Sequence, residues 1–283
     1  MDVFSGFEGQ DRFQEGLNSV VKRVSVEMRF GEQYLDDASL FGRLGFYIHG
    51  SPFVGSWIRL LHFMRCIRSL PYRDVLDAGC GNGDFAVYLS QRFPGANIVG
   101  IDADGDVLRQ SREFSARKRL KNISFQAVDL RQLSAKDAYD LIYSIEVLQY
   151  IPRNKSVVSN FFSALRPGGL VFVHMLGKDW DNKYFFDSRR FTTYNAERPF
   201  LVGEKYSLDE LVRIFRDEGF RVVHARKTFG FFGRLAWELD QITAKRGLVR
   251  ALLLPLIKSI GVLDVLPSRN GCGCLVLARK EVS

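Results

Sequence analysis

Short apolar runs alternate with amphipathic segments from Arg73 to about Val223, and this rhythm constrains the fold more than any other feature. The runs span 75–78, 98–101, 123–125, 141–143 and 170–173. Strands separated by helices imply βαβ units, which put parallel strands in one sheet with helices on both faces. The sequence therefore predicts a doubly wound, Rossmann-like α/β fold.

A glycine-rich turn, Val75 to Gly83 (VLDAGCGNG), follows the first run directly. Glycines allow a sharp turn and let a ligand approach the main chain closely. Their spacing is G-x-G-x-G, whereas dinucleotide-binding loops usually carry G-x-G-x-x-G. Asp84 stands at the expected helix start, where a pyrophosphate would otherwise bind, and its carboxylate would repel phosphate. The loop therefore favours a cationic ligand over a nicotinamide cofactor, and a nicotinamide dehydrogenase is disfavoured.

Three aspartates, Asp77, Asp102 and Asp129, stand at the ends of three successive runs. Ligands of open α/β sheets bind at the carboxyl ends of the strands. Asp77 can accept a hydrogen bond from an ammonium group, Asp102 can hold ribose hydroxyls, and Asp129 can meet an adenine amino group. Each could also be a strand-end turn residue or a helix cap. Their joint order and spacing indicate a nucleoside that carries an amino-acid end.

This pattern resembles class I S-adenosylmethionine-dependent methyltransferases, of the small-molecule type that includes the quinone-biosynthesis enzymes. The resemblance covers roughly 73–223 and the last strand, and it rests on 75–83, Asp102, Asp129, 144–151, 165–169 and 206–220. It implies a mostly parallel seven-stranded sheet closed by an antiparallel hairpin, with strands near Arg221 and Leu275. It also implies S-adenosylmethionine as the cofactor.

The same resemblance gives individual residues a role. Gly79 and Gly81 would line the methionyl group, Ala103 would pack on the adenine, and Ile145 would offer backbone contacts near the sulfonium. The expected cofactor-binding residues are Asp77, Gly79, Cys80, Gly81, Asp102, Ala103, Asp129, Leu130 and Ile145. Gln149-Tyr150 stands where many relatives have an acidic residue followed by histidine, so no acid–base role is assigned there.

The expected reaction is methyl transfer to an acceptor that the sequence does not identify. Methyl transfer is an in-line displacement, so the acceptor must first be held in near-attack geometry. A base is needed mainly for a hydroxyl or a protonated amine. His174, at the end of the fifth run, is the first candidate base, although it could merely hydrogen-bond its neighbours. His49 and the nearby Tyr47 are the second candidates.

Apolar periodicity and its interruptions suggest two domains and two insertions. A helical cap is expected over 1–70 and the Rossmann-like methyltransferase domain over 71–283. Within the second, 177–206 is expected to form an aromatic, lid-like insertion and 230–264 a helical insertion. An aromatic lid and cap favour a small or elongated organic acceptor that is enclosed away from water, although aromatic residues in such a pattern are also typical of a core.

The chain has a formal net charge of +8 and a pI near 9.4, which favours acidic partners. Nucleic acid is disfavoured, because no basic patch has interleaved aromatic residues and no Asn/Asp-Pro-Pro-aromatic motif follows the fourth run. The segment 243–262 has apolar residues with flanking cations and resembles a helix at a membrane surface. A helix packed on the core would show the same pattern. The alternatives are therefore a lipid-linked or isoprenoid acceptor, or a non-catalytic membrane-associated binding module.

The four cysteines show no metal-binding spacing, and Cys272 and Cys274 are interpreted as buried strand residues. The first residues are polar and acidic, which is not typical of a signal peptide. No run reaches 18 uncharged apolar residues. We therefore expect a reduced, cytoplasmic setting, with peripheral membrane contact as the alternative.

Overall fold

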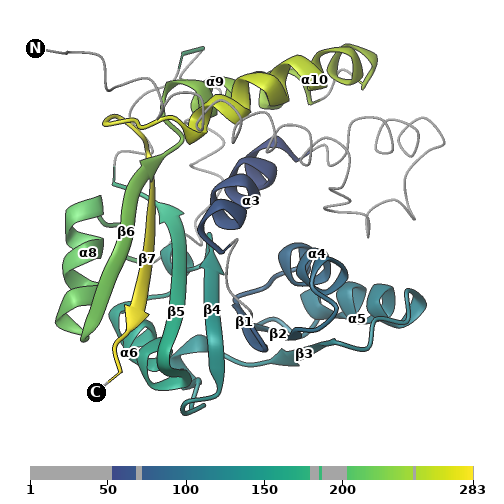
Figure 1. Cartoon of the computed structure of the whole chain (residues 1–283). Helices are drawn as coiled ribbons and strands as arrows, with labels where there is room; N and C mark the ends of the chain where they lie inside the picture. The colour runs from purple at the N-terminus through teal and green to yellow at the C-terminus, as the bar shows by residue number, and fades with distance from the viewer. Residues whose placement is uncertain (1–52, 68–71, 179–184, 187–202, 245–246, 283) are drawn as a thin grey trace, which may run out of the picture.

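The computed structural model describes residues 53–67, 72–178, 185–186, 203–244 and 247–282 (Figure 1). Tyr47, His49, almost all of the expected 1–70 cap and most of the 177–206 insertion lie outside these residues. The described part contains a seven-stranded sheet in the order β3-β2-β1-β4-β5-β7-β6. Its strands are β1 (Asp74–Ala78), β2 (Asn97–Asp102), β3 (Ile123–Ala127), β4 (Tyr139–Ile145), β5 (Leu165–Leu176), β6 (Phe220–Thr228) and β7 (Gly273–Lys280).

The sheet is mostly parallel. Strands β1 to β5 run parallel to one another, whereas β7 is antiparallel to its neighbours β5 and β6. The strand order reverses between β1 and β4, and ligands of doubly wound sheets bind at this switch point. The predicted fold, with its closing antiparallel hairpin, is confirmed.

Helices cover both faces of the sheet, as Figure 1 shows. They are α3 (Val54–Ile67), α4 (Asp84–Arg92), α5 (Val107–Arg117), α6 (Lys155–Ala164), α8 (Leu208–Asp217), α9 (Phe231–Thr243) and α10 (Gly247–Val262). Successive strand residues point to opposite faces. Accordingly, Val75 and Phe172 belong to the core under α3, α4 and α5, while Leu76 and Val173 belong to the core under α6 and α8.

Helix α8 begins at a capping box. The Ser207 hydroxyl accepts a hydrogen bond from the Glu210 backbone N–H, and the Glu210 carboxylate accepts one from the Ser207 N–H. Each of these two hydrogen bonds pairs a backbone N–H that would otherwise have no partner at the start of the helix. Leu211 and Phe215, one turn apart, are fully buried against the sheet. The sequence SLDE therefore fixes the start of the helix, and the spacing of Leu211 and Phe215 fixes the face that it buries.

The two late helices, α9 and α10, pack on each other and on α3 (Figure 1). Arg250 of α10 donates to Asp240 of α9, and Gly261 of α10 lies against Trp57 and Ile58 of α3. A short 3-10 helix, η5 (Leu263–Val265), then leads toward β7. Among the described helices, none combines the length and the apolar character needed to cross a membrane.

Candidate active site

The glycine-rich turn joins β1 to α4, and three of its glycines have positive φ angles: Gly79 at +83°, Gly81 at +51° and Gly83 at +73°. A Cβ at Gly79 would lie 2.4 Å from the Val147 side chain, whereas a Cβ at Gly81 would meet nothing within 4 Å. Gly79 therefore packs closely against the chain after β4. Gly81 leaves its backbone open, and a side chain there would fill this space.

The loop is fixed to the end of β2 by backbone hydrogen bonds. The N–H groups of Gly79 and Cys80 both donate to the Ile101 carbonyl at 2.8 Å. The N–H of Gly81 donates to Asp102 Oδ2 at 2.9 Å. Asp102 is therefore held beside the loop.

Asp77 lies near the end of β1 and is only 3% exposed. Burial raises the pKa of Asp77 to about 8. Burial, and then the neighbouring Asp77, raise the pKa of the Tyr143 phenol as well. The two side chains interact with each other. Within the described residues, however, neither Asp77 Oδ2 nor the Tyr143 hydroxyl makes a hydrogen bond of good geometry. A buried polar atom without a partner is costly in a folded protein and suits a site that a polar ligand completes.

The ends of β2 and β3 lie side by side, because Asp102 pairs with Ala127 and its carbonyl accepts from the Val128 N–H. Asp129 then caps the 3-10 helix η2 (Leu130–Gln132). Its carboxylate accepts from the Arg131 backbone and forms a 2.5 Å ion pair with the guanidinium. The Arg131 side chain is thus the main reason that the pKa of Asp129 is lowered. The role of Arg131 was not predicted from the sequence, and a ligand on Asp129 would have to share the carboxylate with it.

The other two predicted residues of this region differ in exposure. Ala103, directly after β2, is exposed, whereas Leu130 is buried. Both follow the carboxyl ends of neighbouring strands. Ala103 is therefore accessible to a ligand, while the Leu130 side chain belongs to the core beneath this edge.

Ile145 ends β4 and is followed by Glu146, whose φ of +62° is unusual for a residue other than glycine. The Glu146 N–H donates to the His174 carbonyl at 2.8 Å. Its carboxylate binds Arg59 of α3 at 3.1 Å, His174 Nδ1 at 2.8 Å and Gln149 Nε2 at 3.0 Å. This role of Glu146 was not predicted from the sequence, because Arg59 and His174 come from distant segments.

Burial alone would raise the pKa of Glu146, but the Arg59 cation and the hydrogen bond from His174 outweigh it and hold this pKa below its usual value. Glu146 is therefore ionised at neutral pH. A carboxylate can only accept, so His174 Nδ1 carries the proton and Nε2 accepts from the Thr228 hydroxyl at 2.8 Å.

His174 lies on β5 and is almost completely buried. Burial lowers its pKa, although Glu146 acts in the opposite direction. The imidazole is therefore neutral and has a protein partner at each nitrogen. Action as a base, which the sequence predicted for His174, would require the Thr228 bond to be given up.

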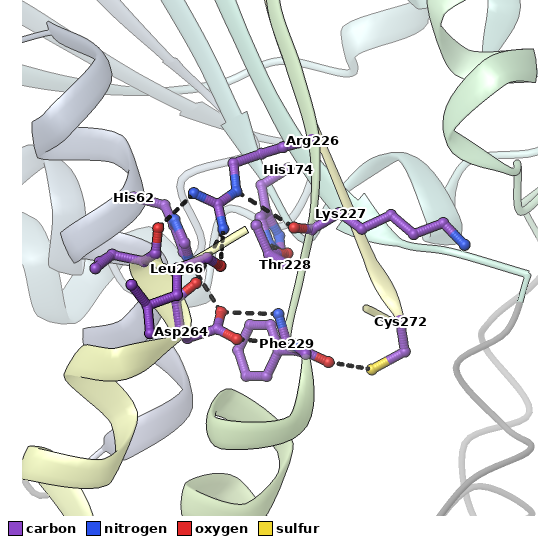
Figure 2. Close-up of polar contacts among 11 residues, drawn as sticks. His62, His174, Arg226, Lys227, Thr228, Phe229, Asp264, Leu266 and Cys272 are labelled. Carbon is purple, nitrogen blue, oxygen red and sulfur yellow. Dashed lines mark hydrogen bonds and ion pairs between the residues drawn. The ribbon is translucent and has the colours of Figure 1, made fainter. Parts of the chain in front are cut away.

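A second buried network lies next to the first and is shown in Figure 2. His62 of α3 binds Asp264 of η5 at 2.8 Å. Asp264 also accepts from the backbone N–H groups of Phe229 and Gly230, both at 2.8 Å. Arg226 of β6 donates to three consecutive carbonyls, 264–266. Together these bonds tie α3, β6 and η5 to one another.

Phe229 connects the two networks. Its φ is +51°, which is rare for a bulky side chain, and the residue is fully buried. The Arg59 guanidinium lies over its ring at 4.8 Å, and the His174 ring lies edge-on to it, 6.0 Å away between centroids. The carboxylate of Glu146, next to the end of β4, is therefore coupled by direct contacts to the late helical part of the chain.

Comparison with known proteins places this architecture in a family. Residues 54–225 match the methyltransferase domain family. The chain is 34% identical over 105 residues to trans-aconitate 2-methyltransferase from Deinococcus radiodurans, covering 37% of this chain and 38% of that protein. It is 31% identical over 106 residues to malonyl-[acyl-carrier protein] O-methyltransferase 2 from Ilyobacter polytropus, covering 38% and 40%. The alignments thus span about two fifths of these relatives.

A solved structure of phosphoethanolamine N-methyltransferase 2 from Haemonchus contortus, in complex with S-adenosyl-L-methionine, shares the fold. Its TM-score is 0.60 at 17% identity, over 87% of this chain and 61% of that one. The family match covers more than half of the chain, so the chain belongs to the methyltransferase domain family. The predicted methyltransferase class is thereby confirmed.

Proposed function

We propose that this protein transfers a methyl group from S-adenosylmethionine to a small organic acceptor. The observation that carries the proposal is the pairing of an open backbone at Gly81 with a buried carboxyl at Asp77, whose Oδ2 has no protein hydrogen bond of good geometry. Both residues lie at the end of β1. An ammonium group can complete such a carboxyl, and a backbone without a Cβ admits the rest of an amino-acid chain. The relatives named above are methyltransferases, which supports methyl transfer as the proposed activity.

The cofactor would extend along the carboxyl ends of β1, β2 and β3. Asp77, Gly79, Cys80 and Gly81 would hold its methionyl end. Asp102 would bind the ribose, and Ala103 would pack on the adenine, whose edge would meet Asp129 and Leu130. Ile145 would border the sulfonium. Bound there, S-adenosylmethionine would supply an electrophilic methyl group.

The residues after β4 would orient the acceptor. Glu146 is ionised and partly exposed at 20% of its side chain, and Arg59 beside it is 12% exposed. A fixed pair of opposite charges can position a polar acceptor and exclude bulk water from it. His174 would hold Glu146 in place and would be the base for an acceptor that must lose a proton. The 1–70 cap, with His49 and Tyr47, and the 177–206 insertion would enclose the acceptor.

Isothermal titration with S-adenosylmethionine tests whether the protein binds the proposed cofactor. We expect micromolar affinity for the wild-type protein and at least a tenfold loss in Asp102→Asn, because the amide replaces the carboxylate that would accept the ribose hydroxyls. Asp106→Asn is the matched control, since this carboxylate is almost fully exposed near the same turn. Tight NADH binding, or equal affinity in both variants, would contradict the proposal.

A second candidate acceptor is a lipid-linked or isoprenoid molecule, which the exposed apolar face of α10 favours. Incubation of labelled cofactor with fractionated cell extract separates the two. Label in polar metabolites supports the soluble acceptor, and label in the lipid phase supports the second candidate. Cofactor binding without label transfer to any fraction would indicate the non-catalytic binding module instead.

A further inference from the structure

Arg59 of α3 lies beside the carboxylate that follows β4, and most of its hydrogen-bonding capacity is unused. Its side chain is 12% exposed, and its Nε lies 3.1 Å from Glu146 Oε1. The guanidinium lies over the Phe229 ring at 4.8 Å. Within the described residues, it forms no hydrogen bond of good geometry and no second ion pair. A guanidinium carries five N–H donors, so a largely buried one that lacks acceptors suits a site that an anionic ligand completes.

Glu146 shows the opposite condition, because donors already surround its carboxylate. Oε1 accepts from His174 Nδ1 at 2.8 Å and faces Arg59 Nε. Oε2 accepts from Gln149 Nε2 at 3.0 Å. Gln149 Oε1 has no partner in the described part of the chain, but this side chain is completely buried, so a ligand would reach Arg59 first. The accessible polar capacity of this site therefore consists of donors on a cation.

These donors are held in place before any ligand binds. On α3, Ile58 and Leu60 are completely buried on either side of Arg59, and the Phe229 ring under the guanidinium is buried as well. A ligand would therefore not have to order the group that binds it. Val147, directly after Glu146, packs on the glycine-rich turn. Arg59 is thus connected through direct contacts to the edge where the cofactor is proposed to bind.

The charges of the site favour a ligand with a single negative charge. Arg59 and Glu146 cancel each other, and the neutral His174 adds no charge. A ligand carboxylate would leave one net negative charge, which complements the sulfonium cation of the proposed cofactor. An ammonium group would instead place a second cation beside Arg59. A phosphate would face the Glu146 carboxylate with nearly two negative charges.

We infer that Arg59 binds a carboxylate of the methyl acceptor, which is therefore an organic acid. A planar guanidinium matches the two oxygens of a carboxylate, and hydrogen bonds between charged groups are the stronger ones. The inference rests on the proposed function, because it names the substrate class of the same site. It concerns how the acceptor is held and assigns no atom to methylation. Arg59 is then a specificity-determining residue and not a base, since a guanidinium stays protonated.

Chemical treatment of the acceptor tests the substrate class without any variant. The full chain is incubated with labelled S-adenosylmethionine and the small-molecule fraction of a cell extract. This fraction is used untreated, after carbodiimide coupling of its carboxylates to methylamine, or after alkaline phosphatase. We expect label transfer to the untreated fraction, at least a tenfold loss after coupling and no change after phosphatase. Equal transfer to the coupled and untreated fractions, or a loss after phosphatase alone, would overturn the inference.

Two variants on α3 test whether Arg59 is the residue responsible. Arg59→Lys keeps the charge but removes the planar fork of donors. We expect the apparent KM, measured by dilution of the untreated fraction, to rise at least tenfold while kcat and the affinity for S-adenosylmethionine change little. Arg65→Lys is the matched control, because Arg65 is exposed on the same helix and should behave like wild type. An unchanged KM in Arg59→Lys, or an equal rise in both variants, would contradict the assignment.

Titration of the wild-type protein with S-adenosylmethionine separates this inference from the proposed function. If the protein binds the cofactor and methylates an acceptor that carbodiimide coupling does not affect, the inference fails and the proposed function stands. If it binds no cofactor and transfers no label, the proposed function fails, and the inference fails with it.

Discussion

At the scale of single residues, the turn after β1 distinguishes two kinds of glycine. Gly79 has a positive φ and its missing Cβ makes room for Val147. Gly81 also has a positive φ, but it faces open space. The first glycine therefore serves packing and the second serves access of a ligand, although the two are indistinguishable in the sequence.

This difference predicts two separable defects. Gly79→Ala combines a strained φ with a clash against Val147, and we expect it to lower the free energy of unfolding by about 2–4 kcal/mol in urea titration. Gly81→Ala should cost only about 1–2 kcal/mol for the left-handed conformation, yet weaken cofactor binding at least tenfold. Adding Val147→Ala should restore part of the stability of Gly79→Ala. Equal stability loss in the two glycine variants would contradict the assignment of Gly79 to packing and Gly81 to ligand access.

At the scale of elements, the late helices are joined to the sheet by buried polar groups as well as by apolar packing. Asp264 on η5 binds His62 on α3 and two backbone N–H groups after β6. Burial alone would raise the pKa of Asp264, but His62 and these N–H donors lower it, so the carboxylate is ionised. A buried charge of this kind is tolerated only because it is fully hydrogen-bonded.

We therefore expect Asp264→Ala to lower the free energy of unfolding by about 3–5 kcal/mol, since it removes one partner of a buried pair and leaves two N–H groups unpaired. Chemical denaturation measures the loss. Glu281→Ala is the control, because this carboxylate forms an ion pair with Arg221 in which both side chains are more than half exposed, and the variant should change stability by about 1 kcal/mol or less. Similar losses in the two variants would show that the Asp264 network does not hold the helices.

The elements that could be predicted from sequence are those with a local signal. The five βαβ strands follow from short apolar runs, the turn from its glycines, and α8 from its capping box. The polar networks could not be predicted in the same way. His62 and Asp264 are separated by 202 positions, and Glu146 and His174 by 28. No local periodicity indicates which charged residues meet once the sheet forms. Arg131 is only two positions from Asp129, but no apolar periodicity indicates that its side chain folds back onto this carboxylate.

At the scale of the whole molecule, the buried titratable groups act on stability in opposite directions. The pKa of Asp77 is raised by burial, so folding favours its protonated form. As the pH falls from about 8, the folded state takes up this proton before the unfolded state does, and stability rises. The pKa values of His62 and His174 are lowered by burial. As the pH falls below about 6.5, the unfolded state takes up their protons first, and stability falls.

Because stability rises as the pH falls from about 8 and decreases again below about 6.5, we predict a maximum of stability near pH 6.5. Urea midpoints measured from pH 5 to pH 9 should show it. Asp77→Asn carries no titrating group at this position, so we expect the variant to lose the rise between pH 8 and 6.5 and to keep the fall at lower pH. A wild-type profile that is flat from pH 5 to 9, or an unchanged profile in the variant, would contradict the assigned protonation states.

The central claim is that the edge formed by the ends of β1, β2 and β3 holds a nucleoside with a charged amino-acid end. A crystal structure with S-adenosylhomocysteine tests it most directly. The account predicts the amino group near Asp77, the ribose hydroxyls on Asp102 and the main chain of Gly81 against the ligand. A ligand bound at another edge of the sheet, or an amino group that points away from Asp77, would contradict it.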